Sequence, residues 1–140
     1  MDCFLCQKHD GRVARPPGGY IYEDANWMVC HAPVDKGPLG TLFIESKRHF
    51  LDFSEATLEE TASYGPMLKK LYTELKALTG AERIYQVIML EGVSHFHAWL
   101  VPRAKEISER GIAFLGKDTS CNEANAIQLA TWLREALSQI

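Results

Sequence analysis

The segment Ser94-His95-Phe96-His97-Ala98-Trp99-Leu100-Val101-Pro102-Arg103 decides how this chain is interpreted. In a strand, alternate side chains point to opposite faces of the sheet. The even-numbered residues of this segment from Phe96 to Leu100 then form a wholly apolar face, which is typical of a core. The opposite face carries two imidazoles and an indole, from His95, His97 and Trp99, and this arrangement indicates a functional site. Taken alone, a His-x-His pair is equally typical of a solvated edge or of two half-buried histidines.

Alternating and short apolar runs predict five strands, at 20–22, 27–30, 41–45, 84–90 and 96–101. The run at 41–45 is apolar on both faces, so we expect it at the centre of the sheet. A tight link at 91–94 is expected to join the last two strands.

Helical spacing begins after Ser54, the expected N-cap, and ends at Gly80, the expected stop. Pro66 should bend this helix or split it. Asn122 is expected to cap a final helix after a loop over 104–121, with an apolar stripe formed by Ile127, Ala130, Leu133 and Leu137. The pattern predicts an α+β fold, a meandering antiparallel sheet with one long and one C-terminal helix, in a single domain over 1–140.

Composition restricts the expected partners. The net charge of the 140 residues is −3 and no basic block exceeds two residues, so a nucleic acid polymer is not an expected partner. No apolar run is long enough to cross a bilayer and the first residues do not resemble a secretory signal. We therefore expect no membrane partner and a cytoplasmic setting, where thiols are normally reduced.

The cysteines divide into a pair and two single residues. Cys30 and Cys121 are expected to be small buried apolar residues. Cys3 and Cys6 form a CxxC pair within an N-terminal segment, 1–18, that is otherwise expected to be irregular. Such a pair fits zinc, redox chemistry or chance, but a redox pair should open a helix after a strand. Two histidines elsewhere would complete a Cys₂His₂ zinc site.

Several stretches resemble the histidine triad (HIT) family. His95 to Arg103 is similar to the signature His-φ-His-φ-His-φ-φ and to the Pro-Arg that follows it in the diadenosine-polyphosphate hydrolase branch. Cys3-Phe4-Leu5-Cys6 resembles the zinc knuckle of many bacterial members, and 40–49 resembles their Gly-His-Thr-Leu-Val-Ile-Pro-Lys-x-His stretch. The hairpin at 22–29, Pro66 and residues 89–92 also match family positions, so the resemblance covers nearly the whole chain.

The resemblance implies roles for individual residues. Cys3, Cys6, His49 and His95 match the ligands of a structural zinc ion, which would fix residues 1–18 to the sheet and leave no open position for catalysis. His97 matches the nucleophile, a neutral imidazole that attacks the α-phosphorus of a nucleotide. The implied partners are a purine nucleotide or dinucleoside polyphosphate and a second copy of the chain in a homodimer.

The sequence departs from the family pattern at three places. Trp99 replaces the third histidine, and its indole N–H donates a hydrogen bond but exchanges no proton near neutral pH. The preceding loop is short and has Leu90 in place of a glutamine, so Ser94 becomes the expected hydroxyl donor to the phosphate. His31 stands where the family has an acidic or amide residue that binds the ribose, although a strand-end residue without function fits equally well.

Three hypotheses follow. The first is a nucleotide hydrolase or nucleotidyl transferase acting on a phosphoanhydride or phosphoramidate, with Trp99 as a wall of the pocket. The second is a nucleotide-binding protein with little or no activity, and the third, disfavoured by the acidic balance, is a zinc-ribbon adaptor. We also expect His9 to be exposed and Arg103 to lie at the surface rather than face a phosphate.

Overall fold

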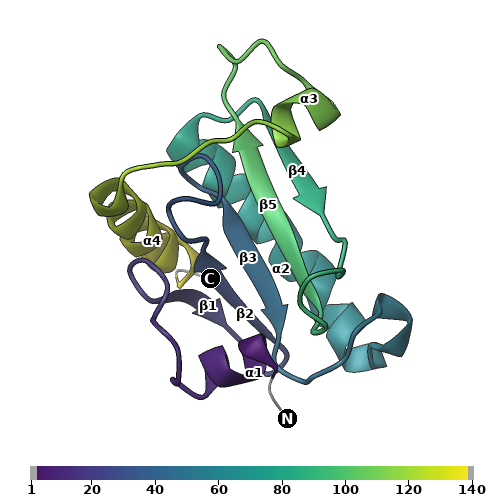
Figure 1. Ribbon diagram of the computed structural model, residues 1–140. Coiled ribbons are helices and arrows are strands. Elements are labelled where there is room, and N and C mark those ends of the chain that lie inside the picture. The colour runs from purple at the N-terminus through teal and green to yellow at the C-terminus, as the bar shows by residue number, and fades with distance from the viewer. Residues whose placement is uncertain (1–2, 139–140) are drawn as a thin grey trace.

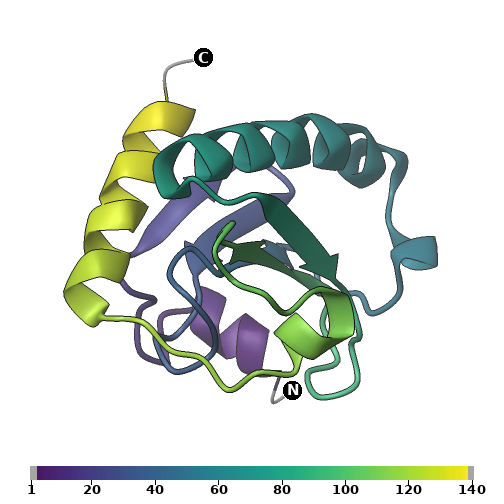
Figure 2. The same cartoon turned by 90° about the horizontal axis from the view of Figure 1, so that it is seen from above.

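The computed structural model describes residues 3–138, which form a sheet with helices on both faces (Figures 1 and 2). The elements in chain order are α1 (Phe4–His9), β1 (Tyr20–Glu23), β2 (Trp27–His31), β3 (Leu42–Ser46), η1 (Phe53–Glu55), α2 (Leu58–Thr79), β4 (Arg83–Val87), β5 (His97–Arg103), α3 (Gly111–Leu115) and α4 (Glu123–Leu137).

The sheet has five strands in the order β1-β2-β3-β5-β4, and every neighbouring pair is antiparallel. The α+β class, the antiparallel sheet and the two principal helices are confirmed, and β3 is central as expected. β5 lies between β3 and β4 because α2 carries the chain across to the far edge of the sheet before β4 begins. This order places His97 opposite Glu45 and Trp99 opposite Phe43.

The two faces of the sheet have different partners. Helices α2 and α4 cover one face and pack against each other, while α1 and α3 lie on the other face (Figure 2). Leu42, Ile44, Ala98 and Leu100 are fully buried toward α2, as the alternation in the sequence predicts for Ala98 and Leu100. The alternate residues of β3 and β5, which include Phe43, Glu45, His97 and Trp99, therefore face α1 and α3, and this is the face that holds the candidate site.

The boundaries of α2 correct the expected N-cap. Thr57, not Ser54, caps the helix: its hydroxyl accepts from the Glu60 N–H, and the Glu60 carboxylate accepts from the Thr57 N–H. This capping box outcompetes Ser54, which lies in η1. Gly80 ends the helix in a left-handed conformation, φ 70°, as predicted. Pro66 does not split the helix, because Ala62, whose carbonyl loses its donor, lies on the exposed side where water can replace the bond.

Four further expectations are wrong in detail. The segment 1–18 contains a helix, α1, and the loop over 104–121 contains α3. The link between β4 and β5 spans 88–96, because the ladder ends at the Val87–Trp99 pair and Leu90, with a positive φ of 62°, cannot continue the strand to its expected end at residue 90. Asn122 caps α4 as expected, but Ile127 is 41% exposed and Leu129 takes its place in the core. Within residues 3–138, no helix is long and apolar enough to cross a membrane.

Candidate functional site

Cys3, Cys6, His49 and His95 come together although they are far apart in the sequence. Their ligand atoms all lie within 4.8 Å of one another. The Nδ1 atom of His95 lies 3.4 Å from Sγ of Cys3, 3.7 Å from Sγ of Cys6 and 3.1 Å from Nδ1 of His49. Ligands bound at about 2.0–2.3 Å to a tetrahedral zinc ion are separated by roughly 3.3–3.8 Å. The cluster therefore has the donor set and spacing of a closed Cys₂His₂ zinc site.

Local structure orients these ligands. Cys3 is the N-cap of α1, and its Sγ accepts from the Cys6 N–H at 3.4 Å, so both thiols lie at the start of the same short helix. The Nε2–H of His95 donates to the Ser46 carbonyl at 2.7 Å, which leaves the Nδ1 lone pair for a metal. Burial lowers the pKa of His95 and so favours the neutral ring that metal binding requires.

A buried carboxylate fixes α1 to the sheet beside this cluster. Glu45 of β3 is fully buried and accepts from Nζ of Lys8 at 2.6 Å, from Nε2 of His9 at 2.9 Å and from the Tyr20 hydroxyl at 2.9 Å. Burial opposes ionisation, but the hydrogen bonds from His9, Lys8 and Tyr20 hold the pKa of Glu45 below its ordinary value. The expectation that His9 is exposed is therefore wrong, because Glu45 draws its side chain inward.

His97 lies at the start of β5 with one ring nitrogen held by the protein. Its Nδ1–H donates to the His95 carbonyl at 2.8 Å. Since a carbonyl only accepts, the proton of the neutral ring lies on Nδ1 and the lone pair on Nε2. No hydrogen-bond partner for that Nε2 is found among residues 3–138, and the ring borders a pocket. This is the state that a nucleophilic imidazole needs.

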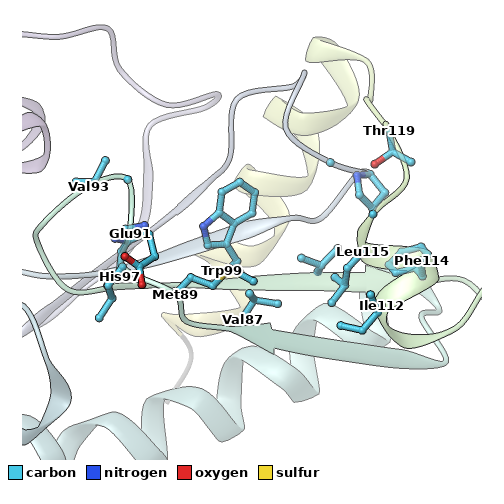
Figure 3. A pocket seen from close by; sticks show the side chains of 16 residues that line it. Val87, Met89, Glu91, Val93, His97, Trp99, Ile112, Phe114, Leu115 and Thr119 are labelled. Atoms are coloured by element: carbon cyan, nitrogen blue, oxygen red, sulfur yellow. The ribbon is translucent and has the colours of Figure 1, made fainter.

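The pocket beside His97 has a volume of about 610 Å³ and lies between the β4–β5 face, the 88–96 link and α3 (Figure 3). Trp99 projects into it, supported by an edge-to-face contact with Phe43 at 4.7 Å between ring centroids. The walls are almost wholly apolar, and the residues that line it are Gly37, Pro38, Val87, Met89, Leu90, Glu91, Gly92, Val93, His97, Trp99, Val101, Ile112, Phe114, Leu115, Gly116 and Thr119.

The structure does not bring the other expected site residues to this pocket. Ser94 is exposed and does not line it. His31 is 1% exposed, its Nδ1–H donates to the Ala32 carbonyl and its Nε2 accepts from the Gly40 N–H, so both ring nitrogens are already used. A ribose contact by His31 finds no support in this placement. Arg103 is 2% exposed rather than at the surface, because Glu82 and the Tyr85 hydroxyl accept from its guanidinium.

The sequence did not lead us to expect two parts of the site. The Glu45 network leaves only a weak signal, a single carboxylate at the end of the apolar run 42–44 in a strand expected to be buried. The signal for helix α3 is also weak: it is the apolar run 112–115 within an otherwise polar loop.

No protein-family model and no curated protein sequence matches the chain. Solved structures do match it. A zinc-bound histidine triad family protein from Mycobacterium smegmatis is 20% identical, with 99% of this chain and 95% of that chain covered at a TM-score of 0.75. The chain has the histidine triad fold. A histidine triad nucleotide-binding protein from Sulfolobus tokodaii, described as hypothetical, is 17% identical (97% and 92% covered, TM-score 0.73), and a HIT-like protein involved in cell-cycle regulation from Bartonella henselae is 14% identical (96% of both chains, TM-score 0.74).

Within the histidine triad fold, the expected resemblance is confirmed at the level of architecture, and the Cys₂His₂ cluster forms where it was expected to form. The donor set and its spacing support a structural zinc ion in this chain. Identities of 14–20% are far too low to transfer a substrate or a reaction, so function must be argued from the residues around His97.

Proposed function

We propose that the chain is a nucleotide hydrolase or nucleotidyl transferase in which His97 attacks the α-phosphorus of a nucleotide conjugate. The observation that carries this proposal is the hydrogen bond from Nδ1 of His97 to the His95 carbonyl, with the pocket beside the ring. The relatives from M. smegmatis and S. tokodaii add support, since one is described as zinc-bound and the other as nucleotide-binding.

The proposed reaction has two steps. The Nε2 lone pair of His97 forms a bond to the α-phosphorus, and the bond to the leaving oxygen or nitrogen breaks with its electron pair on that atom, which takes a proton from solvent. Water then attacks the same phosphorus, releases a proton to solvent and returns the electron pair to Nε2. An alcohol acceptor in place of water would make the reaction a transfer. Ser94, which lies outside the pocket lining, and backbone N–H groups near the start of β5 are the proposed donors to the phosphate oxygens.

The test compares wild type with His97→Gln on adenosine 5′-phosphoramidate, a simple conjugate of a purine nucleotide. We expect the variant to lose turnover by a factor of about 10³ or more, as removal of a nucleophile generally does. Far-ultraviolet circular dichroism and zinc content serve as controls and should not change. Wild-type activity in His97→Gln would reject the assignment.

A structural zinc ion, a homodimer and a cytoplasmic setting complete the proposal. In the bound state, Cys3, Cys6, His49 and His95 would hold the zinc, which fixes α1 to the sheet and takes no part in the reaction. A second copy has a free strand to pair with, because β4 is an edge strand. The four cysteines, all within residues 3–138, form no disulfide there, which agrees with a reducing compartment.

A second candidate function is nucleotide binding without turnover. It is favoured by two features, the indole of Trp99 where the family has a third histidine and the position of Ser94 outside the pocket lining. Calorimetry with AMP separates the two candidates when combined with the activity assay. Tight AMP binding by a wild type that turns over no conjugate would favour the binding protein.

A further inference from the structure

The lining of the pocket beside His97 lacks the positive charge that would stabilise a nucleotide phosphate chain. Of its lining residues only Glu91 carries a charge, and no lysine or arginine contributes to the lining (Figure 3). A di- or triphosphate entering this space would exchange water for apolar walls and a carboxylate, which disfavours it strongly. A group without charge would instead be stabilised there, because burial of apolar surface is favourable.

Strand pairing and hydrogen bonds fix the walls of the pocket. Val87 and Trp99 are directly opposite each other in the β4–β5 ladder and form part of its floor. The α3 wall is fixed to the sheet by Tyr85, whose hydroxyl accepts from the Gly111 N–H at 2.8 Å and from the Arg103 guanidinium at 3.2 Å. The rings of Tyr85 and Phe114 lie 5.6 Å apart. The buried Arg103 and the half-buried Tyr85 therefore hold the helix that closes the pocket.

The position of the pocket relates it to the reacting atom. His97 borders it at the β5 start, and α3 borders it at the opposite end of the strand pair (Figure 3). A substituent on the phosphorus that His97 attacks can therefore extend along Trp99 toward Phe114. The volume of about 610 Å³ is within the range of pockets that hold drug-sized ligands.

We infer that this pocket binds the leaving group of the substrate and that this leaving group is uncharged and mainly apolar, an aromatic or branched aliphatic amine or acyl group rather than a second phosphate chain. The role of the pocket in the reaction rests on the proposed function. The claim that the pocket binds an apolar group rests only on its lining residues and their charge. The inference narrows the expected substrates from dinucleoside polyphosphates to nucleoside monophosphate conjugates of apolar groups.

The first arm of the test measures binding without any reaction. N-phenyl-1-naphthylamine, a neutral apolar fluorophore, is titrated into wild type, Val87→Lys and Ile88→Lys. Ile88 is the matched control because it adjoins Val87 in the chain and does not line the pocket. We expect binding of about one probe per chain in wild type and Ile88→Lys, and binding at least about tenfold weaker in Val87→Lys, since the new ammonium group must lose water when the probe binds.

Three results in this arm would overturn the inference. They are no binding by wild type, equal binding by Val87→Lys, and binding that weakens as the protein concentration rises. The last result would mean that a second copy of the chain covers the pocket.

The second arm compares two conjugates of AMP that differ only in the amine, 2-phenylethylamine or 4-aminobutanoate. Wild type should favour the phenylethyl conjugate by at least about tenfold in kcat/KM, and Val87→Lys should reduce this ratio while Ile88→Lys should not. Equal rates on both conjugates would overturn the leaving-group assignment.

Absence of turnover with either conjugate would contradict the proposed function, not the pocket. In that case the pocket is tested by whether each conjugate displaces the bound fluorophore. Displacement by the phenylethyl conjugate alone supports the inference, and equal displacement by both conjugates refutes it.

Discussion

Replacing Glu45 with glutamine should show how strongly α1 is fixed to the sheet. The substitution keeps the shape of a fully buried side chain and removes its charge. Three donors converge on this carboxylate, and the nearest, Nζ of Lys8, belongs to a side chain that is only 8% exposed. In Glu45→Gln the Lys8 ammonium group loses its counter-ion and faces an amide that offers a competing donor.

The expected cost follows from that loss. Breaking a buried ion pair by removing one partner destabilises a protein by about 3–5 kcal/mol. Because α1 is short and close to the chain end, Lys8 can reach water at the expense of its contacts, which favours the lower end, about 3 kcal/mol. For a chain of this size that corresponds to a decrease in Tm of roughly 10 °C.

Urea unfolding at pH 7 measures the free energy difference, and a matched pair on the surface provides the control. Lys47 and Glu23 are 2.5 Å apart, but their side chains are 34% and 51% exposed, so Glu23→Gln should cost less than about 1 kcal/mol. A double-mutant cycle of Glu45→Gln with Lys8→Met should recover part of the loss. The reasoning is refuted when Glu45→Gln costs no more than Glu23→Gln.

The pH dependence of this cost has a fixed direction. Burial opposes ionisation of Glu45, but the hydrogen bonds from His9, Lys8 and Tyr20 leave its pKa below the ordinary value. The stabilisation is therefore complete above the unfolded pKa of about 4.3 and is lost as the pH falls through the folded pKa. The difference between wild type and Glu45→Gln should shrink below about pH 4.

Three further predictions test other parts of the structure. Burial lowers the pKa of His31, so its contribution to stability is present above the unfolded pKa of about 6.5 and is lost as the pH falls through the folded pKa. The free energy of urea unfolding should therefore depend less on pH between 8 and 5 in His31→Gln than in wild type, and an equal dependence contradicts this. Trp27→Ala removes a fully buried ring and its hydrogen bond to Ser63, and should cost about 3–5 kcal/mol in the same assay; a loss below about 1 kcal/mol contradicts the packing described. A metal chelator should lower the Tm of wild type but not that of Cys3→Ser, and a wild type that melts identically with and without chelator contradicts the zinc assignment.

The sequence predicts those features of this fold that depend on local patterns. The alternation from His95 to Val101 correctly separates a core face from a site face, because the period of a strand is two whatever lies around it. Gly80 and Asn122 mark helix ends because their local backbone and side-chain chemistry is decisive at those positions. The Cys₂His₂ cluster can be predicted only through the family resemblance, since spacing alone leaves the CxxC pair ambiguous.

Features that depend on tertiary partners could not be predicted in this way. Arg103 lies inside because Glu82 and Tyr85, which are distant in the sequence, accept its hydrogen bonds. His9 turns inward toward Glu45 for the same reason. Leu90 gives no sign in the sequence of its positive φ, which leucine rarely adopts, and the length of the 88–96 link was therefore underestimated.

Detection of a nucleotide covalently attached to His97 is the direct test of the proposed mechanism. Wild type and His97→Gln are mixed with adenosine 5′-phosphoramidate, quenched within milliseconds to seconds at alkaline pH, digested and mapped by mass spectrometry. The mechanism predicts an adenylylated peptide that contains His97 in wild type and no such adduct in the variant. Turnover by wild type with no adduct on His97, together with full activity of His97→Gln, would contradict it.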